Sequence, residues 1–206
     1  RQWSKLSPST TPLARYGQVM VYDESIRQIV LTNGNTAYQG HQDDTWLYDT
    51  AANTWTEVFT TGTSGRLKWP GMVYDSSNER CILFGGQVED DPVDRTMIFN
   101  SETDTWVSAN PASAPESRIN PGMAFDVSGQ VVVLFGGMNH DYDQLGDTWC
   151  YSYVDNVWTD MSTEPTSTGT STNTSPADSE LPLTWIVIPA VIVVVVLILY
   201  LVRRRI

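Results

Sequence analysis

The chain has 206 residues with 24 acidic and 12 basic side chains, which give a net charge of −12 at pH 7. Three of the basic residues are Arg203, Arg204 and Arg205, so the chain before them carries a net charge of −15. Because nucleic-acid binding requires a basic surface, this balance excludes a nucleic-acid partner. The cysteines, Cys81 and Cys150, have no metal-ligand spacing and stand where other repeats have apolar residues, which predicts buried thiols.

Four tryptophans, Trp3, Trp55, Trp106 and Trp158, follow one another at intervals of 52, 51 and 52 residues. A period near fifty is typical of a repeat architecture. Each full copy has four short segments rich in β-branched and aromatic residues, separated by Asp, Asn, Ser and Gly turns, without helical periodicity before residue 181. We therefore expect an all-β domain over residues 1–160, with four antiparallel strands per copy.

The strands follow the same order in every copy. The first is expected over residues 20–23, 72–75 and 123–126, and the second over 29–34, 81–86 and 131–137. The third is expected over 44–49, 95–100 and 147–152, and the fourth around Trp55, Trp106 and Trp158. Four strands repeated at this period predict one blade of a β-propeller per copy.

The repeats resemble kelch repeats. The resemblance rests on the double glycines Gly85–Gly86 and Gly136–Gly137 that end strand two, on the aromatic that opens strand three, and on the tryptophan of strand four. Copy one departs with Asn33–Gly34, and copy two with Met97 in place of the strand-three tryptophan. The resemblance implies kelch-type propeller blades, with glycines that allow a positive-φ turn or a close approach between blades.

Two further recurring features predict structural roles. Arg15, Arg66 and Arg118 each precede strand one, which predicts a contact within or between blades. Asp44 and Asp147 immediately precede a repeated threonine, and we expect them to cap the turn into strand three.

Three blades are too few for a ring, because propellers close with about four to eight. Trp3 is expected to lie in an orphan strand of an earlier blade, which implies that blades upstream of Arg1 complete the ring. The alternative is closure by assembly with another chain.

The loops between strands two and three are rich in acidic residues. Those not expected to cap a turn form a candidate acidic rim, since equivalent loops of a propeller emerge on one face: Asp43, Glu89, Asp90, Asp91, Asp141 and Asp143. Carboxylates suit Ca²⁺ or a basic partner, although their spacing matches no EF-hand. Ordinary solvated loops are the alternative interpretation, and we assign no metal-ligand set, cofactor or catalytic residue.

Fifteen of the twenty residues 161–180 are Ser, Thr, Pro, Asn or Gly, and only Met161 among the others is a large apolar residue. Such a composition cannot bury a core, which predicts an extended stalk or a plain linker. Asn173 lies in an N-glycosylation sequon.

Residues 181–202 are uncharged and rich in Val, Ile and Leu, and as a helix they would span about 33 Å, enough for a bilayer. Arg203, Arg204 and Arg205 would then stop transfer and place residues 203–206 in the cytoplasm, with the propeller outside. Leu181 to Thr184, with the apolar stretch and the arginines, also resembles a cell-wall sorting signal, but Trp185 stands where that signal has glycine.

These features predict a single-pass cell-surface protein whose kelch blades bind an extracellular protein or glycan. The alternative is the C-terminal part of a membrane-anchored enzyme, galactose oxidase-like or glycan-active, with catalytic residues upstream. The copper site that galactose oxidase-like chemistry requires has His and Tyr ligands, and His41 and His140 do not occupy equivalent positions.

Overall fold

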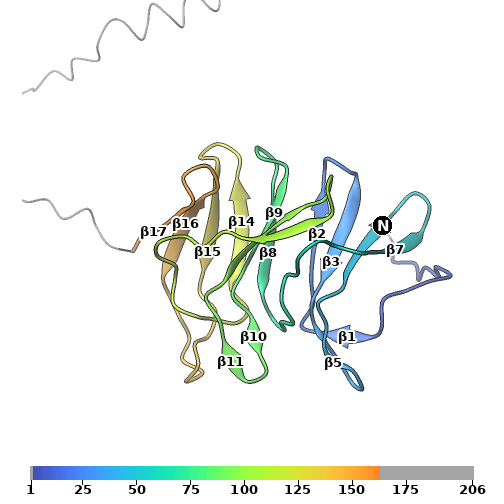
Figure 1. The fold of residues 1–206 in the computed structure, drawn as a ribbon, viewed down its shortest axis with the longest axis horizontal. Coiled ribbons are helices and arrows are strands. Elements are labelled where there is room, and N and C mark those ends of the chain that lie inside the picture. Colours follow the sequence, from blue (N-terminus) through green and yellow to red (C-terminus); the bar gives the residue numbers. More distant parts are fainter. Residues whose placement is uncertain (1, 163–206) are drawn as a thin grey trace, which may run out of the picture. The chain divides into compact units, whose positions relative to one another are not determined.

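The computed structural model describes residues 2–162, which form seventeen strands and no helix. Three four-stranded antiparallel sheets account for most of them (Figure 1). Blade 1 consists of β2 (Val19–Asp23), β3 (Gln28–Thr32), β6 (Thr45–Asp49) and β7 (Thr54–Val58). Blade 2 consists of β8 (Gly71–Asp75), β9 (Arg80–Phe84), β12 (Thr96–Asn100) and β13 (Thr105–Ser108). Blade 3 consists of β14 (Gly122–Asp126), β15 (Val131–Phe135), β16 (Thr148–Ser152) and β17 (Val157–Asp160).

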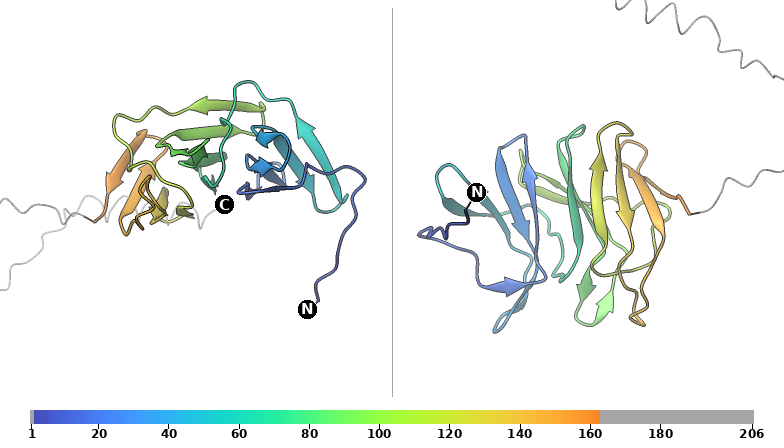
Figure 2. Two further views of the ribbon diagram at one scale, coloured as in Figure 1. Left: turned by 90° about the horizontal axis from the view of Figure 1, so that it is seen from below. Right: turned by 180° about the vertical axis from the view of Figure 1, so that it is seen from behind.

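Strand order in each sheet follows the chain, so every pair of neighbouring strands is antiparallel and joined without a crossover. The first strand β8 of blade 2 contacts the first strands β2 and β14 of the neighbouring blades, and the three sheets fan out from these strands (Figure 2). This arrangement confirms the expected kelch-type blades in the part of the chain that the structure describes.

The hairpin turns have a repeated local cause. Asn53, Asp104 and Asn156 precede the fourth strands and all have positive φ, between 52° and 55°. Asn and Asp tolerate this left-handed conformation better than other side chains, and it lets a short turn reverse the chain. The turns after the first strands also have a residue with positive φ, and a side chain closes them as well, as when Asp75 accepts hydrogen bonds from two backbone amides at 2.9 and 3.0 Å.

Short ribbons connect strand two to strand three in the first two blades. In blade 1, β4 (Asn35–Thr36) pairs with β1 (Arg15–Tyr16) and with β5 (Gly40–His41). In blade 2, β10 (Gln87–Val88) pairs with β11 (Asp91–Pro92). All of these ribbons lie at the lower end of the blades in Figure 1, so the second-to-third-strand loops share one end of the array as expected.

The core consists of two layers, one on each side of blade 2. On β9, Cys81 and Leu83 face blade 1, while Ile82 and Phe84 face blade 3, and all four side chains are buried. Alternate residues of a strand point to opposite faces, so a strand buried on both faces reads as a continuous apolar run. Blades 1 and 3 each have one face without such a neighbour.

The structure differs from expectation around Trp3. Residues 2–7 form no strand, and the Trp3 side chain is 100% exposed. A single strand needs a neighbour to satisfy its backbone hydrogen bonds, and no described residue provides one there. The orphan strand is therefore absent.

The remaining predicted segments lie outside the described residues. They are residues 163–180 of the stalk, which include Asn173, the span over 181–202 and the basic tail over 203–206. Within residues 2–162, no helix is long and apolar enough to cross a bilayer.

Candidate functional site

The tryptophan ladder joins neighbouring blades. Trp106 of blade 2 donates its indole N–H to Thr45 of blade 1 at 3.0 Å, and Trp158 of blade 3 donates to Thr96 of blade 2 at 2.9 Å. Both indoles are buried. The repeated tryptophan and the repeated threonine, which the sequence shows as separate features, are thus the two halves of one contact between blades.

The glycine pairs provide a second contact between blades. Gly85 has a φ of +72°, and a Cβ placed on it would lie 2.5 Å from the carbonyl oxygen of Arg118, which belongs to the segment entering blade 3. The amide of Gly86 donates to that same carbonyl at 2.9 Å. In blade 1, Asn33 takes a φ of +63° and donates its side-chain amide to the carbonyl of Gly65. Both expected roles of the glycines, positive φ and close approach, are confirmed.

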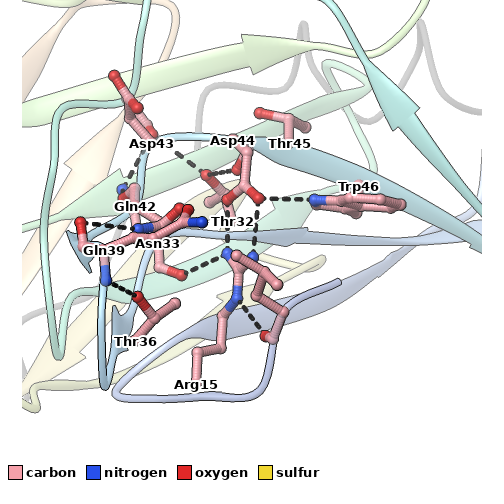
Figure 3. Close-up of polar contacts among 12 residues, drawn as sticks. Arg15, Thr32, Asn33, Thr36, Gln39, Gln42, Asp43, Asp44, Thr45 and Trp46 are labelled. Carbon is pink, nitrogen blue, oxygen red and sulfur yellow. Dashed lines mark hydrogen bonds and ion pairs between the residues drawn. The ribbon is translucent and has the colours of Figure 1, made fainter. Parts of the chain in front are cut away.

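A buried arginine holds the base of each outer blade. Arg15 forms two hydrogen bonds to the carboxylate of Asp44, at 2.5 and 2.7 Å, and this carboxylate also accepts the indole N–H of Trp46 at 2.7 Å (Figure 3). In blade 3 the equivalent trio is Arg118, Asp147 and Trp149, with distances of 2.6, 2.8 and 2.7 Å. We call each trio an Arg–Asp–Trp cluster.

The clusters correct the expectation that Asp44 and Asp147 cap a turn. Each carboxylate binds a guanidinium and an indole, because the arginine side chain reaches back from the segment before strand one. The hydrogen bonds and the charge of Arg118 lower the pKa of Asp147 to about 2. At Asp44, burial acts to raise the pKa, but the hydrogen bonds from Arg15 and Trp46 outweigh it and the pKa falls.

Blade 2 lacks the cluster, and Arg66 is not its arginine. Leu67 occupies the equivalent position, because its carbonyl accepts the amide of Gly34 as the carbonyl of Arg118 accepts that of Gly86. Arg66 is exposed and lies 3.6 Å from Asp43. The aspartate and tryptophan are replaced as well, by Arg95 and Met97.

Leu67 and Met97 both belong to the buried cluster between blades 1 and 2. Blade 2 therefore fills with apolar side chains the place where the outer blades use an ion pair. All three positions of the Arg–Asp–Trp cluster thus differ together in blade 2, where they hold Leu67, Arg95 and Met97.

The loops at the lower end of the blades form the candidate site. We call residues 35–41, 87–92 and 138–144 the loop rim. His140 of the third loop lies 3.5 Å from the carboxylate of Asp91 in the second loop, and Lys68, which precedes blade 2, lies 4.0 Å from Asp90. A depression of about 400 Å³ separates the first two loops, with His41 on one side and Glu89 on the other.

The predicted acidic residues belong to this end of the blades but do not converge on one point. Asp43 pairs with Arg66 and accepts a hydrogen bond from Thr63 at 3.2 Å. Asp141 and Asp143 donate their backbone amides to the side chain of Asn139. Among the described residues, no three His, Cys, Asp or Glu side chains lie close enough together to hold a metal ion.

Sequence reasoning missed the aromatic members of the loop rim. Tyr38 is 99% exposed and Tyr142 is 71% exposed, and each lies in a loop between strands two and three. Beside them, Tyr16 packs against Trp69 with ring centroids 6.0 Å apart, and Lys68 lies 5.0 Å from the Trp69 ring. The sequence contained a signal for these exposed aromatics. Tyr38 and Tyr142 each lie between the glycine that ends strand two and the aspartate that precedes strand three, where no aromatic side chain is needed in a blade core.

The two cysteines are free thiols. Cys81 is buried as expected, and burial raises its pKa. Cys150 is only partly buried, which corrects the expectation for this residue, since β16 belongs to the blade whose outer face is uncovered.

Comparison with known proteins agrees with this architecture. The model of the KLHDC2/KLHL20/DRC7 Kelch-repeats domain family matches residues 1–176, so the chain belongs to that family. Kelch repeats generally mediate protein binding, which makes the three blades a protein-interaction module. No curated protein matches the chain by sequence.

Proposed function

We propose that this chain is a single-pass cell-surface protein whose kelch blades bind a basic segment of an extracellular protein through the loop rim. The observation that carries the proposal is the gathering of Asp90, Asp91, Asp141, Tyr38 and Tyr142 on one end of the blades.

The composition of the loop rim favours a cationic partner. Asp90 is 98% exposed and its only charged neighbour among the described residues, Lys68, lies 4.0 Å away. Such a loose pair contributes little, so this carboxylate is available to an arriving lysine or arginine. Complementary charge raises association rates and selects partners.

The tyrosines provide the apolar part of the contact. Tyrosine is enriched at binding hot spots because it buries a large area and loses little side-chain entropy. Tyr38 and Tyr142 stand on blades 1 and 3, so a partner that contacts both must lie across the intervening loop of blade 2. Strands two and three of each blade anchor the two ends of its loop.

Selection from a random peptide display library tests this contact. We expect enrichment of sequences rich in lysine and arginine, with binding that weakens as salt is added. Asp90→Asn with Asp141→Asn should remove most of the selected binding, whereas Glu102→Gln with Asp104→Asn, at the other end of blade 2, should not. Selection of acidic or uncharged peptides, or equal loss in both double variants, would contradict the proposal. Enrichment only on a glycan array would assign a glycan ligand instead.

The membrane context is the second part of the proposal. It is supported by the uncharged stretch over 181–202, by Arg203, Arg204 and Arg205 behind it and by the stalk composition before it. Protease added to intact cells should remove an N-terminal epitope tag and spare a C-terminal one. The fraction pelleted after alkaline carbonate extraction should contain the protein. Release by carbonate, or loss of both tags, would reject the single-pass anchor.

A further inference from the structure

A strained tryptophan lies where the chain enters blade 2. Trp69 has a φ of +60°, in the left-handed region that a bulky side chain seldom adopts. The equivalent residues before blades 1 and 3 are Gly17 and Asn120, which also have positive φ and tolerate it better. Backbone hydrogen bonds join the three positions, since the amide of Trp69 donates to the carbonyl of Gly17 at 2.7 Å and the amide of Asn120 donates to that of Trp69 at 2.8 Å. The backbone thus favours glycine or asparagine here, and the tryptophan destabilises the fold at this point.

The chain leaves room for the Trp69 indole without burying it in a core. A Cβ on Gly17 would lie 2.8 Å from Cδ1 of the indole, so the ring occupies space that this glycine leaves. Trp69 is partly exposed and belongs to neither of the two hydrophobic core clusters. Its indole N–H donates to no residue of the range 2–162, whereas those of Trp106 and Trp158 join neighbouring blades. Core packing therefore does not explain this tryptophan, and strained residues cluster at functional sites.

A positive charge already lies at the Trp69 ring. The Lys68 ammonium is 5.0 Å from the ring centroid, within the range of a cation–π contact, and 4.0 Å from the carboxylate of Asp90. The Lys68 side chain is only 13% exposed, yet its ammonium donates no hydrogen bond to a described residue. An aromatic face and a carboxylate thus form a site for a cation, which Lys68 occupies without a hydrogen bond.

A buried hydrogen-bond acceptor lies beside Lys68. Gln87 pairs with Lys68 in an antiparallel bridge through two backbone hydrogen bonds, at 2.9 and 3.1 Å, so the two side chains project to the same face. Gln87 is 4% exposed, and its side-chain oxygen has no hydrogen-bond partner in the part of the chain that the structure describes. Because a buried acceptor without a donor destabilises a protein, a ligand that donates to this oxygen is bound more tightly than one that donates to an exposed group.

We propose that an arginine side chain of the partner binds here, in the place that the Lys68 ammonium takes in the free protein. Its guanidinium stacks on the Trp69 ring, pairs with Asp90 and donates to the side-chain oxygen of Gln87. We call these three residues the arginine site. Arginine suits it better than lysine, because the planar guanidinium stacks on aromatic rings and holds several N–H donors in fixed directions. The inference rests on the proposed function, for which it names the anchoring side chain of the basic segment.

Fluorescence anisotropy with labelled hexa-arginine and hexa-lysine peptides tests the arginine site on the full chain in a neutral detergent. We expect hexa-arginine to bind at least about fivefold more tightly than hexa-lysine. Trp69→Asn introduces the residue that stands at position 120, and it should weaken hexa-arginine binding at least about fivefold. The urea midpoint of this variant should stay the same or rise, because the backbone strain is relieved. Phe59→Asn removes an exposed aromatic side chain outside the loop rim and is the matched control, with unchanged binding.

A second pair of variants tests the displacement of Lys68. Lys68→Ala vacates the arginine site and should strengthen hexa-arginine binding at least about threefold. Arg66→Ala removes the same charge from an exposed residue nearby and should change binding less than about twofold. A lowered urea midpoint in Trp69→Asn, or equal effects of Lys68→Ala and Arg66→Ala, would overturn the inference. Equal binding of the two peptides, unchanged in Trp69→Asn, would refute the arginine site but leave the proposed function in place, whereas binding of neither peptide would contradict both.

Discussion

The Arg–Asp–Trp cluster of blade 3 provides the sharpest test of what holds a blade together. Arg118 is fully buried, and its guanidinium binds the carboxylate of Asp147 and the carbonyl oxygens of Gly136 and Glu116. Asp147→Ala removes the carboxylate but leaves the buried cation, which is the most costly way to break such a pair.

The stability lost in Asp147→Ala depends on the hydrogen-bond acceptors that Arg118 keeps. Removing one partner of a buried ion pair destabilises a protein by about 3–5 kcal/mol. Asp147 is 27% exposed and Arg118 keeps its two carbonyl acceptors, so water and these carbonyls compensate for part of the loss. We therefore expect the free energy of unfolding to fall by about 2–3 kcal/mol. Urea denaturation followed by tryptophan fluorescence at neutral pH measures it.

The chain supplies matched controls. Arg66→Ala breaks an exposed ion pair of 3.6 Å and should cost less than about 0.5 kcal/mol. Converting the cluster to the composition of blade 2, with Arg118→Leu, Asp147→Arg and Trp149→Met together, should return the stability to within about 1 kcal/mol of the original, since apolar side chains can replace a buried pair without net loss. Equal losses for Asp147→Ala and Arg66→Ala would refute the reasoning.

The pH dependence has a definite sign. The pKa of Asp147 is lowered by the fold to about 2, from an ordinary value of 3.8. Its contribution to stability is therefore fully present above about pH 4 and is lost as the pH falls toward about 2. The stability difference between the original chain and Asp147→Ala should narrow across this window. A difference that stays constant down to about pH 2 would mean that the carboxylate is not what Arg118 requires.

Three further substitutions test the contacts between blades by the same denaturation assay. Gly85→Ala should lower the free energy of unfolding by at least about 2 kcal/mol more than Gly40→Ala does. Both glycines have positive φ, but only Gly85 is approached by a neighbouring carbonyl oxygen. Similar losses for the two variants would show that this carbonyl does not restrict the side chain at position 85. Asn33→Ala should lower the free energy of unfolding by about 1 kcal/mol more than Asn33→Gly does, since both variants lose the side-chain hydrogen bonds but only alanine is strained at a φ of +63°. A smaller difference would show that backbone strain at this position is not significant. Trp106→Phe should cost about 1–2 kcal/mol by leaving the buried Thr45 hydroxyl unpaired, and Thr45→Val combined with it should recover part of that loss; a double variant worse than the sum would contradict the pairing.

Much of the fold follows from the sequence because the repeat aligns three independent copies. The four strands per blade, the positive-φ glycines and the apolar strand-two runs all recur in register, so each copy supports the assignment of the others. Residues that act alone were harder to interpret. Arg66 is one position away from the register of Arg15 and Arg118, and only the hydrogen bond from the Gly34 amide to the Leu67 carbonyl reveals which residue is equivalent.

The candidate site was only half predictable for a related reason. The acidic residues of the loop rim stand out by charge, but whether they converge depends on loop conformations that no repeat fixes. In blade 3, the backbone amides of Asp141 and Asp143 donate to the side chain of Asn139. In blade 1, Asp43 contacts Arg66 and Thr63 instead. The exposed tyrosines have no periodic partner, so only their exposure distinguishes them from core aromatics.

Residues that join the blades and residues of the loop rim are separate sets. The partner could therefore differ between proteins while the contacts between blades stay the same. Contacts between blades use groups that every copy must supply, such as the strand-four tryptophan and the strand-three threonine, so they recur at the period of the repeat. The loop rim projects beyond these contacts, and no hydrogen bond between blades in the described residues depends on Tyr38 or Tyr142. Substitutions at Tyr38 or Tyr142 should therefore change binding without changing stability, whereas substitutions of the strand-four tryptophans should lower stability first. A loop variant that lost both together would show that the loops also hold the blades in place.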